Sequence, residues 1–376
     1  MHVVQVIANC SSVPFFNQFA DRISQYPDVK FTFVALYDKK PQMLSDMAER
    51  NCDCYWIKFD WRKRKSGMIS AFFQLYKLFR KLKPDVVNTH LFDDSFPALL
   101  AARLAGVKMR VIHKQDTAFH WVYNPKWVWA DKFNNYNATH IVAVSNESRK
   151  FIVEKEKAPV SKVYKIHSGI DFKSITGQDE IEKNLLREKF GLKDRIVIGT
   201  VSRYIDWKGY KYVIEAARII LPKYKNLKFL FIGQGEQQKE LEDLVEKYGL
   251  KENIVFTGWV DYKIMPSLYG VMDIYLHAAI MEPFGFAITE AMANRVPLVV
   301  TKTGGPGDVL IHKETCYFTE YKSPQSIADG IEWMIKNKEI VNGMKDKIEK
   351  LAYENFPVDK MLSEFIHLYM DKAKQA

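Results

Sequence analysis

The stretch DIYLHAAIMEPFGFAITEAMANRVPLVVTK, residues 273–302, contains the pattern on which the fold prediction rests. Its first segment, DIYLHAA, is a short run of apolar, β-branched and aromatic residues that is typical of a strand. Pro283 and Gly285 then indicate a turn, FAITEAMAN predicts a helix, and PLVVTK predicts a second strand. A strand, a helix and another strand in this order form the unit from which parallel sheets are built.

Runs of the same kind alternate with helical patterns along the rest of the chain. They are apolar on both faces, as expected for parallel strands that helices cover on both sides. The predicted strands are VVQVIA, VKFTFVAL, DVVNTH, KMRVIH and THIVAVS in the first half, then RIVIGTVS, LKFLFIG and NIVFTGW before the stretch quoted above. We therefore predict an α/β protein with two doubly wound, Rossmann-like domains that face a cleft.

The boundary between the domains is predicted at SGIDFKSITGQDE, residues 168–180, because this segment combines glycines and polar residues without periodicity. The N-terminal domain then spans 1–172 and the second domain 173–356. The final segment, 357–376, has apolar residues along one side and predicts an amphipathic helix.

The composition is that of an ordinary globular protein. The chain has 376 residues, of which 47% are hydrophobic and 27% charged, enough for two domains with full cores. No uncharged apolar run of about 18 residues occurs and the N-terminus lacks a basic region, so we predict neither a membrane span nor a signal peptide, and a cytoplasmic protein. Cys52 and Cys54 form a CxC pair without further ligands nearby, so we expect reduced thiols and no metal site.

The positive charge is unevenly distributed. Residues 1–175 contain 27 Lys and Arg against 16 Asp and Glu, whereas the remainder contains 28 against 29. The net charge of +10 therefore comes from the N-terminal half. Such asymmetry fits a domain that meets an anionic partner, whether nucleic acid, membrane surface or charged substrate, and equally an ordinary soluble basic surface.

Two cations follow the predicted strand RIVIGTVS, at the end where parallel sheets bind ligands. Arg203 offers a planar fork of N–H donors and Lys208 a compact point charge, which together suit a diphosphate. The alternative is a pair of solvated surface cations. We favour the binding role because of their position.

Two carboxylates flank the turn that precedes the predicted helix FAITEAMAN. Glu282 comes before the helix, while Glu290 lies within its apolar run, where an unpartnered charge would be costly. The first helical N–H groups, near 285–287, form an anion site. A ligand with phosphates and sugar hydroxyls would satisfy all of these groups, and the alternative for Glu290 is a buried charge paired within the protein.

Two glycine pairs also follow predicted strands. Gly233 and Gly235 match only part of the GxGxxG dinucleotide fingerprint, so a tight turn is favoured over a phosphate contact at Gly233. Gly304 and Gly305 permit either a close approach to a ligand or an ordinary turn.

These motifs together resemble the signature of the family-4 retaining glycosyltransferases of GT-B fold. The resemblance rests on Arg203 and Lys208 in SRYIDWKG, on Glu282 and Glu290 in EPFGFAITEAMANRVPLVVTKTGG, and on HSGID at 167–171. It implies a nucleotide-diphosphate sugar donor, UDP-sugar before GDP-sugar, with no further cofactor. It also implies that the helix 357–376 returns to the N-terminal, acceptor-binding domain.

The resemblance assigns roles to these residues. Arg203 and Lys208 would hold the leaving diphosphate, and Glu290 would accept the ribose hydroxyls. Glu282 would bind the donor sugar together with the backbone of three residues, Phe284, Gly285 and Phe286. The implied reaction is transfer with retention to a glycan or lipid-linked acceptor, in cell-surface polysaccharide or lipopolysaccharide synthesis. No DxD triplet occurs, so we expect metal-independent transfer.

One feature of the N-terminal half is matched to the family, and another departs from it. Family members have a histidine near the sugar, for which His113 fits best and His120 is the reserve. Many members have a glycine-rich loop after the first strand, whereas this chain has ANCSSVPFFNQ. We expect hydroxyls there, such as that of Ser12, to contact donor or acceptor.

Two segments combine aromatic and basic residues. The segment 61–83, WRKRKSGMISAFFQLYKLFRKLK, is either a basic amphipathic surface for anionic lipid or, somewhat preferred, a helix buried on most sides. WVYNPKWVWADKF, residues 121–133, suits sugar stacking, a membrane interface or plain packing.

Other functions remain open from the sequence. A sugar phosphorylase or a nucleotide-sugar epimerase would use much of the same cleft, and phosphate-dependent turnover would identify the phosphorylase. A basic RNA-binding protein is the non-enzymatic alternative, but no RNA-binding module is present, so we expect no nucleic-acid partner.

Overall fold

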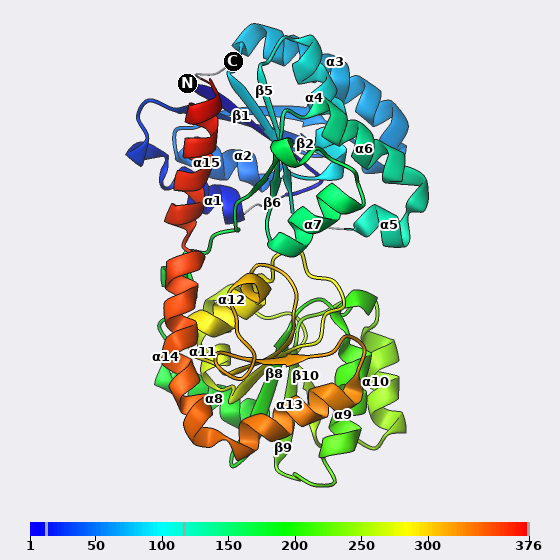
Figure 1. The fold of residues 1–376 in the computed structure, drawn as a ribbon, viewed down its shortest axis with the longest axis vertical. Helices are drawn as coiled ribbons and strands as arrows, with labels where there is room; N and C mark the ends of the chain where they lie inside the picture. Colours follow the sequence, from blue (N-terminus) through cyan, green and yellow to red (C-terminus); the bar gives the residue numbers. More distant parts are fainter. Residues whose placement is uncertain (12–13, 116–117, 374–376) are drawn as a thin grey trace. The chain divides into compact units, whose positions relative to one another are not determined.

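The computed structural model describes residues 1–11, 14–115 and 118–373. They form two compact units, Met1–Gly169 with Val358–Ala376, and Ile170–Pro357 (Figure 1). The predicted ranges, 1–172 with 357–376 and 173–356, lie close to these bounds. Each unit is a parallel sheet with helices on both faces, which confirms the prediction of two doubly wound, Rossmann-like domains.

The sheet of the first unit has seven parallel strands in the order β3-β2-β1-β4-β5-β6-β7. The chain moves outward from β1 to β3 and then returns to start β4 beside β1, so the strand order reverses between β1 and β4. The strands are β1 His2–Ala8, β2 Lys30–Tyr37, β3 Asp53–Lys58, β4 Val86–Thr89, β5 Met109–Lys114, β6 His140–Ala143 and β7 Val163–Lys165.

Helices cover both faces of this sheet because each has an apolar side to bury. They are α1 Pro14–Ala20, α2 Gln42–Glu49, α3 Arg64–Leu82, α4 Phe92–Leu104, α5 Phe119–Tyr123, α6 Val128–Asn137, α7 Asn146–Glu154 and α15 Val358–Ala373. The last helix, α15, packs against α1 and β5 (Figure 1). Its buried side chains, Met361 and Phe365 among them, join the core of this unit, so the expected return of the terminal helix is confirmed.

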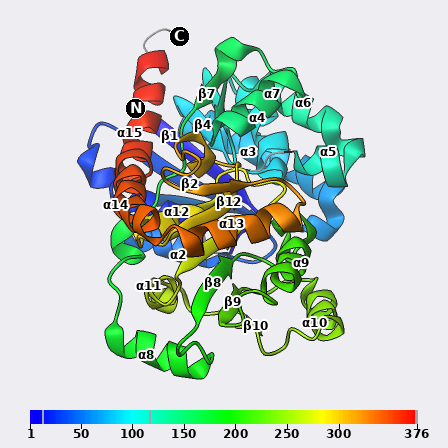
Figure 2. The same ribbon diagram turned by 60° about the horizontal axis from the view of Figure 1, so that its bottom comes forward.

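The second unit has six parallel strands in the order β10-β9-β8-β11-β12-β13. The strands are β8 Ile196–Val201, β9 Leu227–Ile232, β10 Ile254–Phe256, β11 Ile274–His277, β12 Leu298–Thr301 and β13 Tyr317–Thr319. The helices are α8 Glu180–Lys189, α9 Tyr210–Ile220, α10 Gln238–Lys247, α11 Met265–Gly270, α12 Phe286–Ala293, α13 Pro324–Lys336 and α14 Lys338–Asn355. Among them α9 and α13 pack against each other (Figure 2).

The register of the second sheet aligns the ends of its central strands. Tyr275 of β11 pairs with Gly199 of β8, and His277 pairs with Val300 of β12. The strand order reverses between β8 and β11, which is where open parallel sheets bind ligands. The loops after β8, β11 and β12 therefore emerge side by side at the carboxyl edge of the sheet.

Within the described residues, none of the helices combines the length and the apolar character needed to cross a bilayer. All four cysteines are free thiols. The described part of the chain also contains no group of three His, Cys, Asp or Glu side chains placed to hold a metal ion.

Candidate functional site

Three loops of the second unit are joined by backbone hydrogen bonds at the carboxyl edge of its sheet. Ile280 N–H, after β11, donates to Trp207 O in the loop after β8 at 2.8 Å. Gly305 N–H, after β12, donates to Phe284 O at 2.8 Å. The sequence-predicted residues of the three loops are therefore held in one place.

A buried cluster of Lys208, Glu282 and His277 lies between the first two loops. Glu282 Oε2 accepts hydrogen bonds from Lys208 Nζ and, at 3.0 Å, from His277 Nε2. The Lys208 and Glu282 side chains are only 13% and 11% exposed. Charged groups this buried interact strongly, since little water screens them.

The ionisation of the cluster follows from these contacts. Burial alone would raise the pKa of Glu282, but the hydrogen bond from His277 and the charge of Lys208 outweigh it and lower the pKa to about 2. Burial lowers the pKa of His277, and the neighbouring Glu282 opposes this only in part. At neutral pH Glu282 is therefore a carboxylate and His277 a neutral imidazole.

Another residue of β11, Tyr275, fixes the orientation of the His277 imidazole. The Tyr275 hydroxyl lies 3.3 Å from His277 Nδ1. A neutral imidazole that donates from Nε2 to a carboxylate must accept at Nδ1, so the Tyr275 hydroxyl is the donor there. His277 was not among the predicted site residues, although a histidine at the end of an apolar strand, five residues before Glu282, was a usable signal.

The turn after Glu282 leads directly into α12. Phe284 is buried, Gly285 has φ 95° and precedes the helix, and Phe286 is 45% exposed at its first position. The first N–H groups of a helix have no acceptor within it and carry a partial positive charge. The expected anion-binding helix end thus adjoins the cluster that contains Glu282.

Glu290 of α12 is buried and held by two tyrosines. The Tyr269 hydroxyl donates to Oε2 at 2.7 Å and the Tyr262 hydroxyl to Oε1 at 3.1 Å. Burial raises the pKa of Glu290, and these two hydrogen bonds offset part of the rise. The structure thus supplies partners for the carboxylate within the protein, which the sequence did not identify. Each oxygen keeps a lone pair for another donor.

Arg203 lies in the same loop as Lys208, after β8, and its side chain is exposed. No described residue forms an ion pair with it. Lys208, in contrast, already pairs with Glu282. The two cations thus differ: Arg203 can turn to a ligand freely, whereas Lys208 is held in place.

The predicted glycines allow loops to approach each other closely. A Cβ on Gly233 would lie 2.1 Å from Ser202 O, and one on Gly304 would lie 2.2 Å from Phe284 O. Gly304 has φ 67°, which disfavours other residues as well. These contacts support a packing role for Gly233 and Gly304, and Gly305 donates to Phe284 as described above.

The remaining candidates, His113, His120 and Ser12, belong to the first unit. His113 of β5 is fully buried between the rings of His90 and Phe365, and burial lowers its pKa to about 3. His120 contacts Asp131 Oδ2 through Nδ1 at 3.0 Å. Ser12 lies outside the described residues. The proposed contacts of His113 and Ser12 with a ligand stay predictions.

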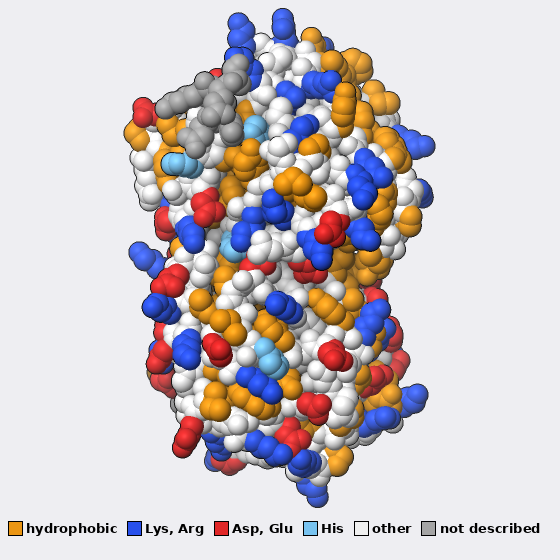
Figure 3. Space-filling model, viewed as in Figure 1, with side chains coloured by type: hydrophobic (Ala, Val, Ile, Leu, Met, Phe, Trp, Pro, Cys, Tyr) orange, Lys and Arg blue, Asp and Glu red, His pale blue; other side chains and the backbone are white. Residues whose placement is uncertain are grey.

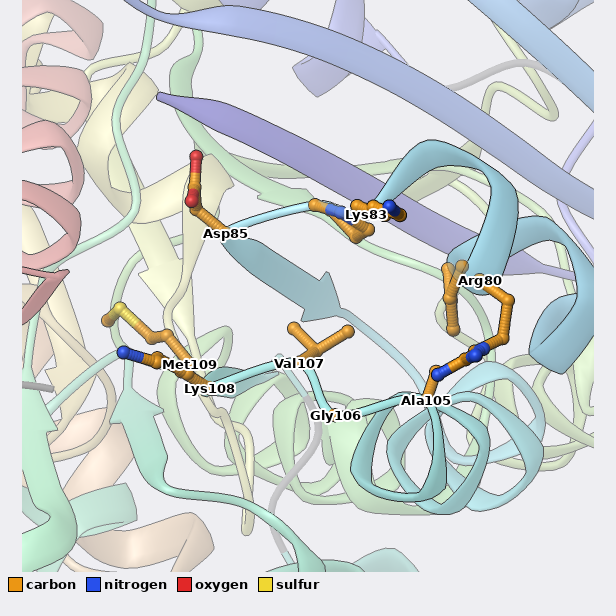
Figure 4. Close-up of a pocket in the computed structure, with 10 residues that line it drawn as sticks. Arg80, Lys83, Asp85, Ala105, Gly106, Val107, Lys108 and Met109 are labelled. Atoms are coloured by element: carbon orange, nitrogen blue, oxygen red, sulfur yellow. The ribbon is translucent and has the colours of Figure 1, made fainter.

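A cavity of about 420 Å³ lies at the amino edge of the sheet of the first unit. Figure 4 shows Arg80 and Lys83 on the α3 side of it and Gly106–Met109 on the other. Asp85 and Lys108 precede β4 and β5, so this is the amino edge of the sheet. Parallel sheets bind ligands at the carboxyl edge, and none of the predicted site residues lines this cavity.

Two family models match the chain, one in each unit. Residues 182–351 match the model described as glycosyl transferases group 1, and residues 30–174 match that of glycosyltransferase family 4.

Several curated proteins are similar in sequence. An uncharacterised glycosyltransferase of Methanocaldococcus jannaschii is 28% identical over 63% of this chain and 61% of its own length. The capsular polysaccharide biosynthesis glycosyltransferase CapM of Staphylococcus aureus is 26% identical over 84% of each chain. The Escherichia coli UDP-Gal:α-D-GlcNAc-diphosphoundecaprenol α-1,3-galactosyltransferase is 24% identical over 81% of this chain and 79% of its own.

Solved structures share the fold. Anabaena HepE in complex with UDP superposes with a TM-score of 0.83 at 18% identity, over 99% of this chain and 100% of the other. HepE in complex with UDP-glucose superposes with a TM-score of 0.82.

Proposed function

The chain belongs to the group 1, family 4 glycosyltransferases of GT-B fold, and from this premise we propose that it transfers a sugar from a UDP-sugar, with retention and without a metal ion, to a glycan or lipid-linked acceptor. The observation that carries the proposal is the buried cluster of Lys208, Glu282 and His277 beside the N-terminus of α12. A reaction with such an acceptor belongs to the synthesis of cell-surface polysaccharide or lipopolysaccharide, and we include this role in the proposal.

The cations and the helix end act on the leaving group. As the bond to the sugar breaks, negative charge develops on the departing diphosphate. Arg203, Lys208 and the first N–H groups of α12 are donors that stabilise this charge, and Lys208 is held in place by its largely buried pair with Glu282. In retaining transfer the acceptor hydroxyl attacks from the face that the diphosphate leaves, so the same donors also hold the diphosphate beside the acceptor.

The carboxylates hold the donor by its hydroxyls. Glu282 stays ionised at all physiological pH values because its pKa is lowered to about 2, so it accepts hydrogen bonds from the donor sugar. His277 fixes the position of Oε2 and leaves Oε1 for the sugar. Glu290 accepts the ribose hydroxyls with the lone pairs that Tyr262 and Tyr269 do not use.

The relatives support the choice of substrates. HepE binds UDP and UDP-glucose, and the E. coli relative is named for UDP-galactose and a diphosphoundecaprenol-linked sugar. CapM is named for capsular polysaccharide biosynthesis. A UDP-sugar donor and an acceptor of glycan or lipid-linked type agree with these names.

The outer face of α3 supports contact with an anionic membrane. Met68, Leu75 and Phe79 are buried, as the packing interpretation expected, but Ile69 is 62% and Phe73 is 57% exposed. In Figure 3 apolar and basic side chains gather at the upper right, where Figure 1 shows α3 and α6. Exposed apolar residues among lysines suit the headgroup region of an anionic bilayer.

A thermal-shift panel tests the donor site. UDP, GDP, ADP and CDP are added without acceptor or metal to the wild type and to Lys208→Ala. Of the four nucleotides, we expect only UDP to stabilise the wild type, by about 2.7 kcal/mol at a concentration 100 times its Kd. The same concentration of UDP should stabilise the variant much less. No response to any nucleotide would contradict the proposal.

Turnover then tests the reaction. Transfer from UDP-sugars to a panel of glycan and polyprenyl-diphosphate sugar acceptors is followed by NMR, with the anomeric configuration of the product read from its coupling constant. We expect the product to keep the donor's anomeric configuration. We also expect the rate to be unchanged in EDTA, because Arg203 and Lys208 supply the positive charge that stabilises the leaving diphosphate. Inversion, loss of activity in EDTA, or turnover that requires inorganic phosphate would each overturn the corresponding part.

A further inference from the structure

A second pocket lies at the carboxyl edge of the first sheet, where β1 and β2 end. It has a volume of about 390 Å³, within the range of about 300–1,000 Å³ that is usual for small-molecule sites. Its lining residues come from four places in the sequence: Asn9 after β1, Tyr37 at the end of β2, Trp61 and Arg64 before and at the start of α3, and Asp93 in the first turn of α4.

Its polar side is a connected group centred on Asp93. Asp93 Oδ1 accepts from Arg64 Nε at 2.6 Å, and Oδ2 accepts from Asn9 Nδ2 at 2.5 Å. The Asp93 side chain is 13% exposed, and Arg64 is fixed further by the rings of Phe92 and Trp127, 4.8 and 5.1 Å from its guanidinium carbon. The carboxylate neutralises the guanidinium, so the pocket carries no excess charge that would attract a phosphate.

The turn after β1 presents Asn9 to this group. Asn9 has φ 58°, and its N–H donates to Leu36 O of β2 at 3.0 Å. The left-handed region suits glycine best and asparagine next. Asparagine thus preserves the turn without a glycine, and it adds a side-chain amide whose oxygen and second N–H remain for a ligand.

Its apolar side is aromatic and open to solvent. Trp61 is 59% exposed although it is the largest apolar side chain in the pocket, and Tyr37 is half-buried beside it. A pyranose ring has a face of C–H groups and a rim of hydroxyls. The C–H face packs on the electron-rich face of an indole, and the hydroxyls exchange hydrogen bonds with carboxylate and amide groups.

We propose that this pocket binds a neutral sugar ring, stacked on Trp61 and hydrogen-bonded to Asp93 and Asn9. The identification of that sugar as part of the acceptor glycan rests on the proposed function, whereas the binding of a saccharide does not. A nucleotide or a phosphate would require an excess of positive charge, which the pairing of Arg64 with Asp93 removes.

Saturation-transfer NMR on the full chain tests the proposal. The probes are the methyl glycosides of glucose, galactose, mannose and N-acetylglucosamine, the corresponding disaccharides, and methyl phosphate. We expect at least one neutral glycoside to receive saturation, and Trp61→Ala to weaken its binding at least tenfold while Trp61→Phe keeps most of it. The matched control is Trp129→Ala, because Trp129 is 55% exposed but does not line the pocket.

The outcomes are separable from those of the donor site. Trp61 is largely exposed, so its removal leaves the core and the UDP response intact. No saturation of any neutral saccharide, equal saturation in the wild type and Trp61→Ala, or preferential saturation of methyl phosphate would each overturn the proposal. Loss of the UDP response in the wild type would contradict the proposed function and leave the saccharide pocket standing.

Discussion

At the scale of single residues, the two glutamates of the candidate site are buried with opposite consequences. The lysine and histidine beside Glu282 lower its pKa to about 2 despite burial. Glu290 has only neutral hydroxyl donors, so burial raises its pKa. One carboxylate therefore stabilises the folded protein at neutral pH, whereas the charge of the other costs stability there.

Glu290→Gln should separate activity from stability. A neutral amide removes the buried charge, so we expect the melting temperature at pH 7 to stay equal or to rise. Transfer should fall about 10- to 100-fold, because a charged acceptor for the ribose hydroxyls is lost. Thermal melts and initial rates are measured side by side, and a variant that melts much lower with full activity would contradict both the site and the pKa argument.

Glu282→Gln should destabilise the protein in a pH-dependent manner. The pKa of Glu282 falls from 4.5 to about 2 on folding, so its contribution is present above pH 4.5 and is lost as the pH falls toward 2. We expect the free energy of unfolding of the variant to be lower than that of the wild type by on the order of 3 kcal/mol at pH 7 and by less at pH 3, measured by urea unfolding. Glu332→Gln is the control, because Glu332 pairs with Lys223 and Lys336 at the surface, where solvent screens the charges.

The sequence identified one side of these interactions and missed the other. Glu282 and Glu290 could be predicted because a carboxylate beside an apolar run is conspicuous along the chain. The partners of Glu290, Tyr262 and Tyr269, are more than 20 residues away along the chain, and only the fold brings them close. His277 lies five residues before Glu282, so it could have been identified, whereas an isolated tyrosine gives no local sign of the carboxylate that it meets.

At the scale of elements, the predicted strands include every inner strand of both sheets and one edge strand, β10. The strands missing from the prediction are β3, β7 and β13, and all three lie at sheet edges. An edge strand is partly open to water, so β3 is mostly exposed or half-buried and lacks a continuous apolar run. The remaining two have three residues each, VYK and YFT, and each ends in a polar residue, whereas the equally short β10 is the wholly apolar IVF.

The prediction at this scale concerns two exposed apolar side chains of α3, Ile69 and Phe73. The double variant Ile69→Ser/Phe73→Ser should bind phosphatidylglycerol vesicles several-fold more weakly than the wild type, because the two exposed side chains insert among the headgroups. Vesicle flotation measures this. The control is Ile181→Ser/Leu185→Ser on α8, where two apolar residues with the same spacing are 73% and 61% exposed beside Glu180 and Glu182. Equal flotation on anionic and neutral vesicles would contradict membrane binding.

At the scale of the whole molecule, each unit has its own core. The core of the second unit is built from α9, α10, α13 and the strands between them, while those of the first unit include α15 from the far end of the chain. Amphipathic periodicity predicted α15 as a helix, and only the family resemblance indicated the unit to which it returns. The destination of a terminal helix depends on which apolar face lacks a cover, and no local pattern contains that information.

Separate cores predict two unfolding transitions in calorimetry of the full chain, since each unit can unfold without opening the core of the other. UDP should raise only the transition of Ile170–Pro357, which contains Lys208 and Glu282. Phe365→Ala should lower only the other transition, because Phe365 is buried in the core of the first unit and its truncation costs about 3–5 kcal/mol. A single transition that both UDP and Phe365→Ala shift would mean that the units unfold together. If UDP shifted only the transition that Phe365→Ala lowers, the nucleotide would bind the first unit, which would contradict the proposed donor site.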